Sequence, residues 1–119
     1  MNLQRGDIVL VWFPFTSGAG GKVRPGLVVQ NDANNQRLTN TVLAAITSTT
    51  HRSREPTQLL IELATVEGRA SGLLFDSAIT CENLATVEQR LIQRKIGSLA
   101  SSLMVQVDQC LKASLGLSP

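Results

Sequence analysis

The sequence is poor in the side chains that build metal centres. Its 119 residues include one histidine, His51, and two cysteines, Cys81 and Cys110. A structural zinc site needs about four such ligands at short spacings, so these three separated residues predict no metal and no cofactor site. Each cysteine stands among apolar neighbours, which favours two small buried thiols. A disulfide between them is the alternative.

Long apolar segments are also missing. The longest uninterrupted run covers residues 8–13. A membrane-spanning helix needs about 20 apolar residues, which is far more than this run provides. The N-terminal residues lack the basic, apolar and small-residue zones of a secretory signal peptide. We therefore expect a protein that meets no membrane and works in the cytoplasm, where thiols stay reduced.

Size and charge set two further bounds. A chain of 119 residues and 12.8 kDa has the length of one domain, which we expect to span residues 1–119. A core of that size buries roughly two-thirds of the unfolded surface. The net charge of +2 and the pI near 8.8 are only mildly basic, so binding to an anionic polymer would depend on a local patch.

Short apolar runs typical of β-strands make up most of the sequence. In the run at 41–47, alternation places Val42, Ala44 and Ile46 toward a core and leaves Thr47 accessible at the strand end. Turn-forming residues separate the runs. The runs cover residues 7–13, 26–31, 41–47, 58–63 and 77–83, with shorter candidates at 84–88 and 92–97 and with turns at 31–35 and 67–72.

A helical pattern follows the last strand. Apolar residues recur every three or four positions between 101 and 115. Ser101 or Ser102 can cap the start of this helix, and Gly116 stands where a C-terminal cap glycine would. Many short strands and one helix predict a mainly β fold, a small barrel of antiparallel strands with a C-terminal α-helix.

Residues 17–32 place a glycine-rich loop, a cation and an apolar strand next to one another. Pro25 restricts Arg24 to an extended backbone, so the guanidinium would project from the point where the loop becomes a strand. That position suits a cation that binds an anion. The alternative is an ordinary solvated arginine at a strand start.

Other candidate residues gather in two places. Thr47 ends a strand and is followed by a polar loop with His51, Arg52 and Arg54, while Glu82 falls on a strand face away from the core. No phosphate-binding glycine motif, serine triad or carboxylate pair stands out. An arginine fork matches phosphate oxygens and stays charged, so these residues suit a phosphate-containing ligand. His51 would be solvated or would contact that ligand, and catalysis by it is the less favoured alternative.

Several segments together resemble one known family. They are residues 5–9 (RGDIV), 21–32 (GKVRPGLVVQND), 44–47 (AAIT) and 76–83 (DSAITCEN). Each is weak alone, but their order and combination are specific, and with the terminal helix they cover nearly the whole chain. The sequence is similar to the MazF/PemK (Kid) toxins of bacterial toxin-antitoxin systems.

This resemblance implies an SH3-like barrel that forms a homodimer. It also implies an endoribonuclease that cuts single-stranded mRNA without metal by attack of the 2'-hydroxyl, and a cognate antitoxin protein that blocks the site. Arg24 and Thr47 match the family's catalytic pair. Glu82 matches an aspartate that one branch uses, but that branch's preceding arginine is Thr80 here. Whether Glu82 is a base, a surface carboxylate or an ion-pair partner of Arg24 therefore stays open.

The resemblance also implies RNA contacts around the catalytic pair. The basic side chains would contact phosphates without reading sequence, and Phe15 could stack on a base. Aromatic residues make up only 3% of the chain and tyrosine is absent, so recognition should depend mainly on hydrogen bonds to base edges. Two other functions stay open: a toxin of this fold that binds a protein, as a gyrase poison does, and an RNA-binding barrel that cuts nothing. The candidate RNA-binding residues are Phe15, Lys22, Ser48, His51, Arg52 and Arg54.

Overall fold

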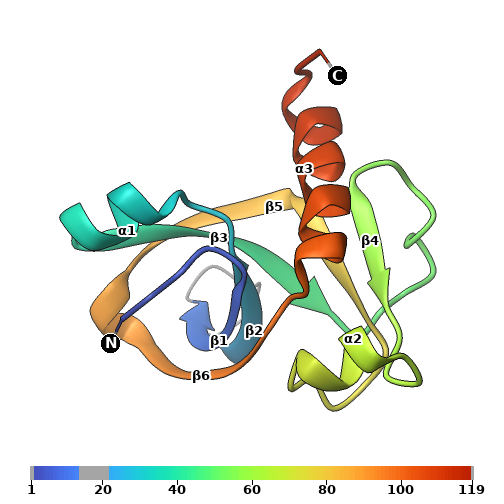
Figure 1. Cartoon of the computed structure of the whole chain (residues 1–119), viewed down its shortest axis with the longest axis horizontal. Coiled ribbons are helices and arrows are strands. Elements are labelled where there is room, and N and C mark those ends of the chain that lie inside the picture. The colour runs from blue at the N-terminus through green and yellow to red at the C-terminus, as the bar shows by residue number, and fades with distance from the viewer. Residues whose placement is uncertain (1, 14–21, 119) are drawn as a thin grey trace.

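Figure 1 shows a computed structural model of the chain, which describes residues 2–13 and 22–118. Six strands, three α-helices and one short 3-10 helix follow one another along the described residues. In chain order they are β1 (Asp7–Phe13), β2 (Lys22–Val28), α1 (Asp32–Arg37), β3 (Asn40–Thr47), β4 (Gln58–Ile61), α2 (Val66–Ala70), β5 (Ser77–Glu88), η1 (Gln89–Leu91), β6 (Ile92–Ser98) and α3 (Ser101–Leu115).

The strands form one curved antiparallel sheet in the order β4-β5-β3-β2-β1-β6. The mainly β fold with a C-terminal helix is thus confirmed, but the sheet is not closed into a barrel, because β4 and β6 are not paired. The turn after α2 packs against β6, where a methyl group on Gly72 would lie 1.9 Å from the carbonyl oxygen of Ile96. Backbone packing therefore takes the place of hydrogen bonding beside this edge.

A β-bulge divides β3 and β5 into two halves. Ala44 lies opposite Leu84 and Ala45 lies opposite Thr80, so residues 81–83 of β5 have no direct partners in β3. Such a bulge shifts the alternation of side chains between the two faces. The extra residues belong to β5, and β3 changes its buried face at the same point: Leu43 is buried in one core group and Ala44 and Ile46 in the other. Val42 lies on the face that the first half of β3 leaves half-buried, so its predicted core position is wrong, whereas Ala44 and Ile46 are buried as expected.

Two groups of buried side chains fill the concave spaces of this sheet. One lies under α3 and includes Ile8, Ile79 and Val107, all fully buried. The other lies toward the start of β3 and includes Val11 and Leu43. Burial of these large apolar side chains is the main favourable term in folding such a small domain.

The two cysteines belong to the first group of buried residues. Both are buried free thiols, as the sequence predicted. The Cys110 Sγ–H donates to the carbonyl oxygen of Gln58 at 3.5 Å, which ties α3 to β4. Burial raises the pKa of Cys81 to about 12, so this thiol stays protonated and unreactive near neutral pH.

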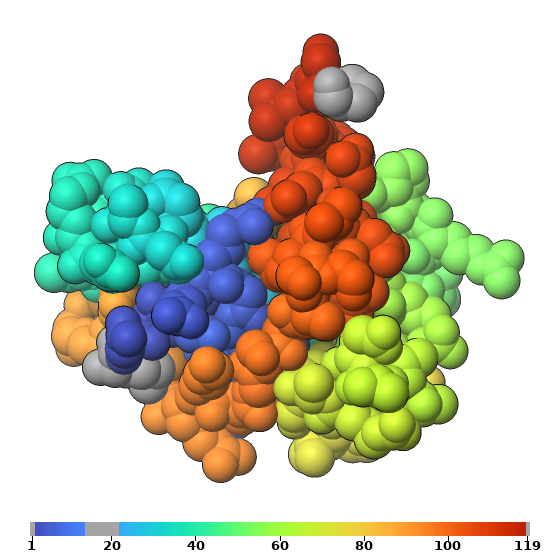
Figure 2. Space-filling model, in the orientation of Figure 1, coloured from blue at the N-terminus to red at the C-terminus, as the bar shows by residue number. Residues whose placement is uncertain are grey.

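The helix α3 begins and ends where the periodicity predicts. Gly116 follows it with a φ of 70°, the left-handed conformation that glycine adopts without strain. The N-cap residue is Ala100, which has no side-chain cap, so the predicted serine cap is wrong. The C-terminal end of α3 projects from the body of the molecule, and Figure 2 shows the N-terminal segment between α1 and α3.

Two segments predicted as turns are short helices. The Asn31 side chain accepts a hydrogen bond from the Asn34 backbone N–H and caps α1, and Thr65 caps α2 through the Gly68 N–H. Asparagine and threonine favour turns and helix N-caps for the same reason, because their short polar side chains bond nearby backbone groups. Residue type alone therefore does not separate the two structures.

The second strand is displaced from its predicted range. It covers Lys22–Val28 instead of residues 26–31, so Arg24 and Pro25 lie inside β2. The predicted strand run at 84–88 is confirmed as the second half of β5, and the run at 92–97 is confirmed within β6. No helix in the described part of the chain is long and apolar enough to span a membrane.

Candidate active site

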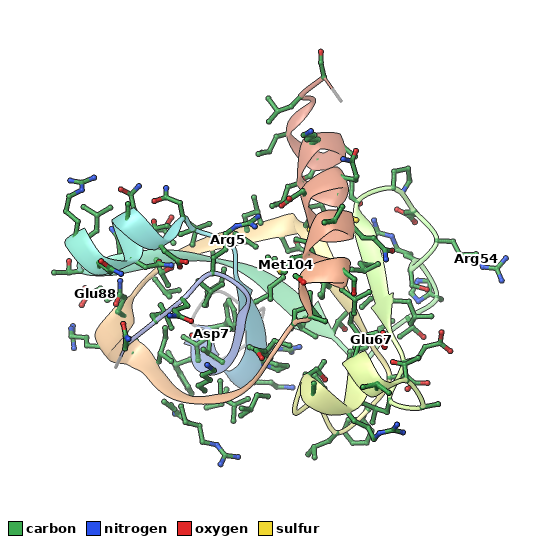
Figure 3. The ribbon with its side chains drawn as sticks, in the orientation of Figure 1. Arg5, Asp7, Arg54, Glu67, Glu88 and Met104 are labelled. Carbon is green, nitrogen blue, oxygen red and sulfur yellow. The ribbon has the colours of Figure 1, made fainter. Side chains whose placement is uncertain are left out.

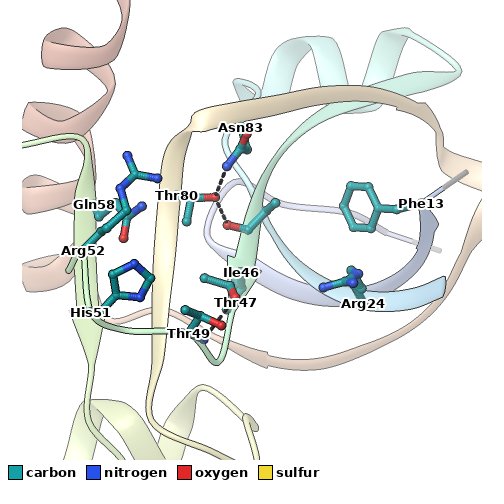
Figure 4. Close-up of a pocket in the computed structure, with 11 residues that line it drawn as sticks. Phe13, Arg24, Ile46, Thr47, Thr49, His51, Arg52, Gln58, Thr80 and Asn83 are labelled. Carbon is teal, nitrogen blue, oxygen red and sulfur yellow. Dashed lines mark hydrogen bonds between the residues drawn. The ribbon is translucent and has the colours of Figure 1, made fainter. Parts of the chain in front are cut away.

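A pocket of about 410 Å³ lies beside β2, β3 and the loop between β3 and β4 (Figure 4). It brings together Arg24, Thr47 and His51, which the sequence had placed in three separate segments. The pocket is lined by Phe13, Arg24, Ala45, Ile46, Thr47, Thr49, His51, Arg52, Gln58, Thr80 and Asn83.

Arg24 projects into this pocket from the third position of β2. It lies opposite Val11 of β1 and is followed by Pro25, so its backbone is held extended within the sheet. Its Nε atom is buried and has no hydrogen-bond partner among the described residues. A buried donor without a partner costs about 1–3 kcal/mol, and a bound phosphate oxygen would remove that cost.

Thr47 ends β3 and is half-buried, consistent with the predicted accessible position. Its Oγ1 accepts a hydrogen bond from the Thr49 backbone N–H at 3.1 Å. The hydroxyl proton makes no hydrogen bond to another described residue, so it can be donated to a ligand.

A second pocket of about 460 Å³ meets the first at Arg24 and Thr47. Ser48 and the exposed side chains of Leu74 and Phe75 line it. The two residues of the predicted catalytic pair therefore lie where two hollows join, an arrangement that leaves room for a chain-like ligand on either side of them.

Glu82 lies in the β5 bulge and does not line the first pocket. Its Oε2 accepts a hydrogen bond from Gln58 Nε2 at 2.8 Å and pairs with Arg52 Nη2 at 2.9 Å. Partial burial opposes ionisation, but these hydrogen bonds and the arginine charge outweigh it and lower the pKa of Glu82. The partner of this carboxylate is thus Arg52, and the carboxylate is a weaker base than an ordinary glutamate.

Arg52 is engaged on both sides. Besides Glu82, it makes two hydrogen bonds of 2.8 Å to the carboxylate of Glu55, which lower the pKa of that carboxyl. Its charge is therefore already offset by two carboxylates, and an RNA phosphate would have to compete with both of them.

The other predicted RNA-binding residues occupy different positions. His51 is exposed and lines the first pocket, whereas Arg54 points away from the body of the molecule (Figure 3). Lys22 is exposed at the start of β2 and lines neither pocket. Phe15 lies outside the described residues.

Besides Thr49, which follows the predicted Thr47 and Ser48, three polar residues of the pocket were not among the predicted site residues. The Thr80 hydroxyl donates to the Ala45 carbonyl oxygen at 2.7 Å, and Asn83 Nδ2 donates to Thr80 Oγ1 at 3.2 Å (Figure 4). The third is Gln58. They reach the pocket because of the β5 bulge and the register between β4 and β5. Neither the bulge nor the register can be predicted from the local sequence.

The described residues hold no group of three or more histidine, cysteine, aspartate or glutamate side chains that could bind a metal ion.

The family model "PemK-like, MazF-like toxin of type II toxin-antitoxin system" matches residues 4–115. The chain belongs to this family. The resemblance found in the sequence segments is therefore confirmed, and it extends over both halves of the sheet and the terminal helix.

Two curated relatives of this MazF-like chain are named as endoribonucleases. Endoribonuclease MazF of Staphylococcus epidermidis is 32% identical over 117 residues, which cover 98% of this chain and 93% of that protein. Endoribonuclease EndoA of Bacillus subtilis is 32% identical over 118 residues, 98% of this chain and 97% of that protein.

Solved structures share the fold at lower identity. The Mycobacterium tuberculosis toxin MazF-mt6 matches with a TM-score of 0.77 and 22% identity, over 95% of this chain and 99% of that one. A mycobacterial endoribonuclease in complex with its cognate antitoxin matches with a TM-score of 0.78 and 21% identity, over 98% of both chains. At these identities the likeness establishes the fold.

Proposed function

We propose that this MazF-like chain is a sequence-specific, metal-independent endoribonuclease toxin that cleaves single-stranded mRNA in the cytoplasm and thereby inhibits translation and growth. The observation that carries the proposal is the meeting of Arg24 and Thr47 where two pockets join, with the Arg24 Nε lacking a partner among the described residues.

The reaction we assign to this pair is a transesterification at phosphorus. The ribose 2'-hydroxyl oxygen attacks the adjacent phosphorus and the bond to the 5'-oxygen breaks, which leaves a 2',3'-cyclic phosphate and a free 5'-hydroxyl. Arg24 stabilises the charge that develops on the phosphoryl oxygens, and Thr47 donates a hydrogen bond that orients one of them. One such preorganised donor is worth about 100- to 1,000-fold in rate.

The two pockets suit the nucleotides on either side of the cleaved bond. Base edges would meet hydrogen-bonding groups in the first pocket, where Gln58, Thr80 and Asn83 are available. Lys22, Ser48, His51, Arg52 and Arg54 remain proposed RNA contacts, and so does Phe15 as a stacking residue. Because two carboxylates offset the charge of Arg52, we expect its contribution to be smaller than that of Lys22.

The remaining assignments concern partners. We propose that the chain acts as a single domain, that it forms a homodimer, and that a cognate antitoxin protein covers the site. The match to a mycobacterial endoribonuclease in complex with its cognate antitoxin supports the last of these.

The decisive experiment incubates the purified protein with a long RNA in EDTA and maps the ends of the products. We expect discrete cuts with 2',3'-cyclic phosphate and 5'-hydroxyl ends, and no cleavage where a 2'-deoxynucleotide provides no nucleophile. Arg24→Ala should lower kcat/KM by roughly 100- to 1,000-fold. Thr47→Val, which removes only the hydroxyl, should also reduce it.

Arg37→Ala is the matched control, because Arg37 is exposed on α1 and bonds only to Asn34 among the described residues. Cleavage unchanged by Arg24→Ala would contradict the assignment. Loss of cleavage in EDTA would show that a metal takes part. Growth inhibition without any RNA cleavage would favour the protein-binding toxin, and RNA binding without cleavage would favour the non-catalytic barrel.

The antitoxin assignment has its own test. The cognate antitoxin, added in increasing amounts, should suppress cleavage completely at saturation because it occupies the groove that RNA needs. Full activity in a saturated complex would place the antitoxin elsewhere on the surface.

A further inference from the structure

The cleavage proposed above requires a group that takes the proton of the attacking 2'-hydroxyl, and one side chain of the first pocket suits that task. His51, the single histidine of the chain, lines this pocket together with Arg24 and Thr47. We infer that His51 is the general base of the reaction. This inference rests on the proposed endoribonuclease function and adds a catalytic residue to it.

The carboxylates near the pocket are poorly suited to the same role. Glu82 and Glu55 both face Arg52 and are held by it, Glu55 through two hydrogen bonds and Glu82 through one contact of 2.9 Å. Hydrogen bonding to Arg52 is the main cause that lowers the pKa of Glu55, so both carboxyls hold their charge and bind protons weakly. A base in this state cannot accept a proton from a hydroxyl efficiently.

The catalytic pair itself contains no base. A guanidinium carries its proton at every working pH, and a threonine hydroxyl is far too weak an acid or base near neutrality. Imidazole, in contrast, takes up and releases a proton within the physiological pH range, which is why it serves most often in proton transfer.

The imidazole is accessible and unoccupied by other side chains. His51 is exposed on the pocket wall and makes no hydrogen bond with another described residue, while the Glu55 carboxylate is close enough to interact with it electrostatically. Figure 4 shows its ring at one end of the pocket, next to Arg52 and Gln58, with Thr47 and Thr49 between it and Arg24. A ligand bound over Thr47 would therefore have the imidazole on one side and the Arg24 guanidinium on the other.

The loop that carries His51 is held by its own hydrogen bonds. The Ser53 N–H donates to the Thr50 carbonyl oxygen and the Glu55 N–H donates to that of Arg52, both at 3.0 Å. The Arg52–Glu55 pair then links the ends of the second turn. These bonds define the backbone from which the imidazole projects, so the loop does not have to form when substrate arrives.

Charges of both signs surround the ring. Arg52 and Glu55 come from the same loop as His51, and Glu82 of β5 pairs with Arg52. Arg24 of β2 lines the pocket as well. The pocket residues contributed by β3 and β4, among them Thr47 and Gln58, are uncharged. The opposed charges of Arg52 and its two carboxylates leave Arg24 as the pocket cation that is not offset by a described residue.

The proposed step balances as follows in chemical terms. The 2'-hydroxyl proton passes to a neutral imidazole nitrogen of His51 while the 2'-oxygen bonds to phosphorus. The bond from phosphorus to the 5'-oxygen breaks, and that oxygen takes a proton from water. The imidazolium then returns its proton to the hydroxide, which restores the neutral ring. No atom changes its oxidation state.

The test compares wild type with His51→Gln and His51→Ala on an RNA of known cleavage site, between pH 5 and 9. We expect kcat/KM of wild type to rise with pH on its acid side, because only a neutral imidazole can accept the proton of the 2'-hydroxyl. Both variants should lose roughly 100- to 10,000-fold in kcat/KM and should lack this rise. Added imidazole should restore part of the activity of His51→Ala.

Binding separates a base from an RNA contact. Affinity for an oligonucleotide with a 2'-deoxynucleotide at the cleavage site should change by less than about threefold in both variants, because general-base catalysis acts on the barrier and not on binding. Ser53→Ala is the control in the same loop, since the Ser53 side chain lines neither pocket. Thermal melts of all variants verify that each is folded, and His51→Gln keeps the test valid if the alanine variant melts early.

The possible outcomes are distinct. Wild-type kcat/KM in His51→Gln would overturn the inference, and so would a loss of binding equal to the loss of activity, which would make His51 an RNA contact only. If Arg24→Ala abolishes cleavage while His51→Gln does not, the proposed function stands and this inference fails. If wild-type protein cleaves no RNA, the proposed function itself fails.

Discussion

Arg24 and Arg52 line the same pocket, but their guanidinium groups differ in their surroundings. Arg52 contacts two carboxylates, whereas Arg24 has a buried Nε without a partner among the described residues. An arginine that is already paired gains little from a phosphate, because the new contact replaces an existing one. The unpaired arginine gains the full charge-assisted hydrogen bond. Of these two residues, Arg24 is therefore the one prepared for an anionic ligand.

A prediction at this scale concerns the Glu82 carboxylate. Its pKa is lowered in the folded protein, so its ionised form stabilises the fold above the pKa of an unfolded glutamate, about 4.3. Glu82→Gln should lower the free energy of unfolding at pH 7 by about 1 kcal/mol, a modest value because partial exposure screens the pair with Arg52. As pH falls through the folded pKa of Glu82, the difference from wild type should disappear.

Urea unfolding at pH 7 and at pH 3 measures this difference. Glu62→Gln is the control, since the Glu62 side chain makes no hydrogen bond or ion pair with other described residues. An equal destabilisation by Glu82→Gln at both pH values would mean that the charge of Glu82 has no part in its effect.

At the scale of elements, the bulge between β3 and β5 shapes the pocket. It moves residues 81–83 out of the regular pairing, which directs Glu82 toward Arg52 and Gln58 and lets Asn83 reach the Thr80 hydroxyl. Bulges often reorient side chains beside functional sites in this way. The pocket thus depends on an irregularity of the sheet.

Gly72 offers a prediction about the open edge of the sheet. It has a φ of 74°, and a methyl group there would lie 1.9 Å from the Ile96 carbonyl oxygen, so Gly72→Ala combines backbone strain with a clash. We expect a loss of at least about 3 kcal/mol in the free energy of unfolding. Gly116 has a similar φ of 70° but open space around it, so Gly116→Ala should cost only about 1–2 kcal/mol. Chemical denaturation of both variants provides the comparison, and equal losses would disprove the close approach to β6.

The packing of α3 gives a second prediction for an element. Val107 is fully buried among core residues, whereas Val105 on the same helix is 62% exposed. Val107→Ala should lower the free energy of unfolding by about 1–3 kcal/mol, because it removes two buried methyl groups and leaves a cavity. Val105→Ala should stay within about 0.5 kcal/mol of wild type. Thermal and urea unfolding would measure both, and a similar effect of the two substitutions would refute the assigned helix face.

At the scale of the whole molecule, the net positive charge is small, so the cations that could bind RNA are those near the two pockets. The net charge is only +2, and two of the cations are paired: Arg5 with Asp108, and Lys95, which lines the second pocket, with the buried Asp7. A net charge this small gives little general attraction for nucleic acid. Binding should depend on the few cations near the two pockets.

This distribution predicts a shallow salt dependence of RNA binding. The logarithm of the affinity falls by about 0.7 per neutralised phosphate for each tenfold rise in salt for single strands, so two or three contacts give a slope of about −1.4 to −2.1. Titration of an oligonucleotide with 2'-deoxy substitution at the cleavage site, between 50 and 200 mM salt, would measure it. Arg37→Ala should leave the slope unchanged, and a slope steeper than about −4 would indicate a broad basic surface.

The sequence alone determined the features that depend on neighbours in the chain. An apolar run predicted β1 and the periodicity of apolar residues predicted α3, both at their observed bounds. Gly116 marked the end of the helix, and Pro25 indicated the extended backbone of Arg24. These features could be predicted because strand and helix propensities act over a few neighbouring residues. The family resemblance then singled out Arg24 and Thr47, and the structure places both at one pocket.

Only the tertiary structure decided the features that depend on distant segments. The bulge opposite Ala44, the pairing of Glu82 with Arg52, and the meeting of His51 with Arg24 and Thr47 all arise from the registers of β3, β4 and β5. Register is selected by the packing of the whole core and has no local signature. For the same reason the sequence predicted a small antiparallel barrel, whereas the sheet stays open between β4 and β6.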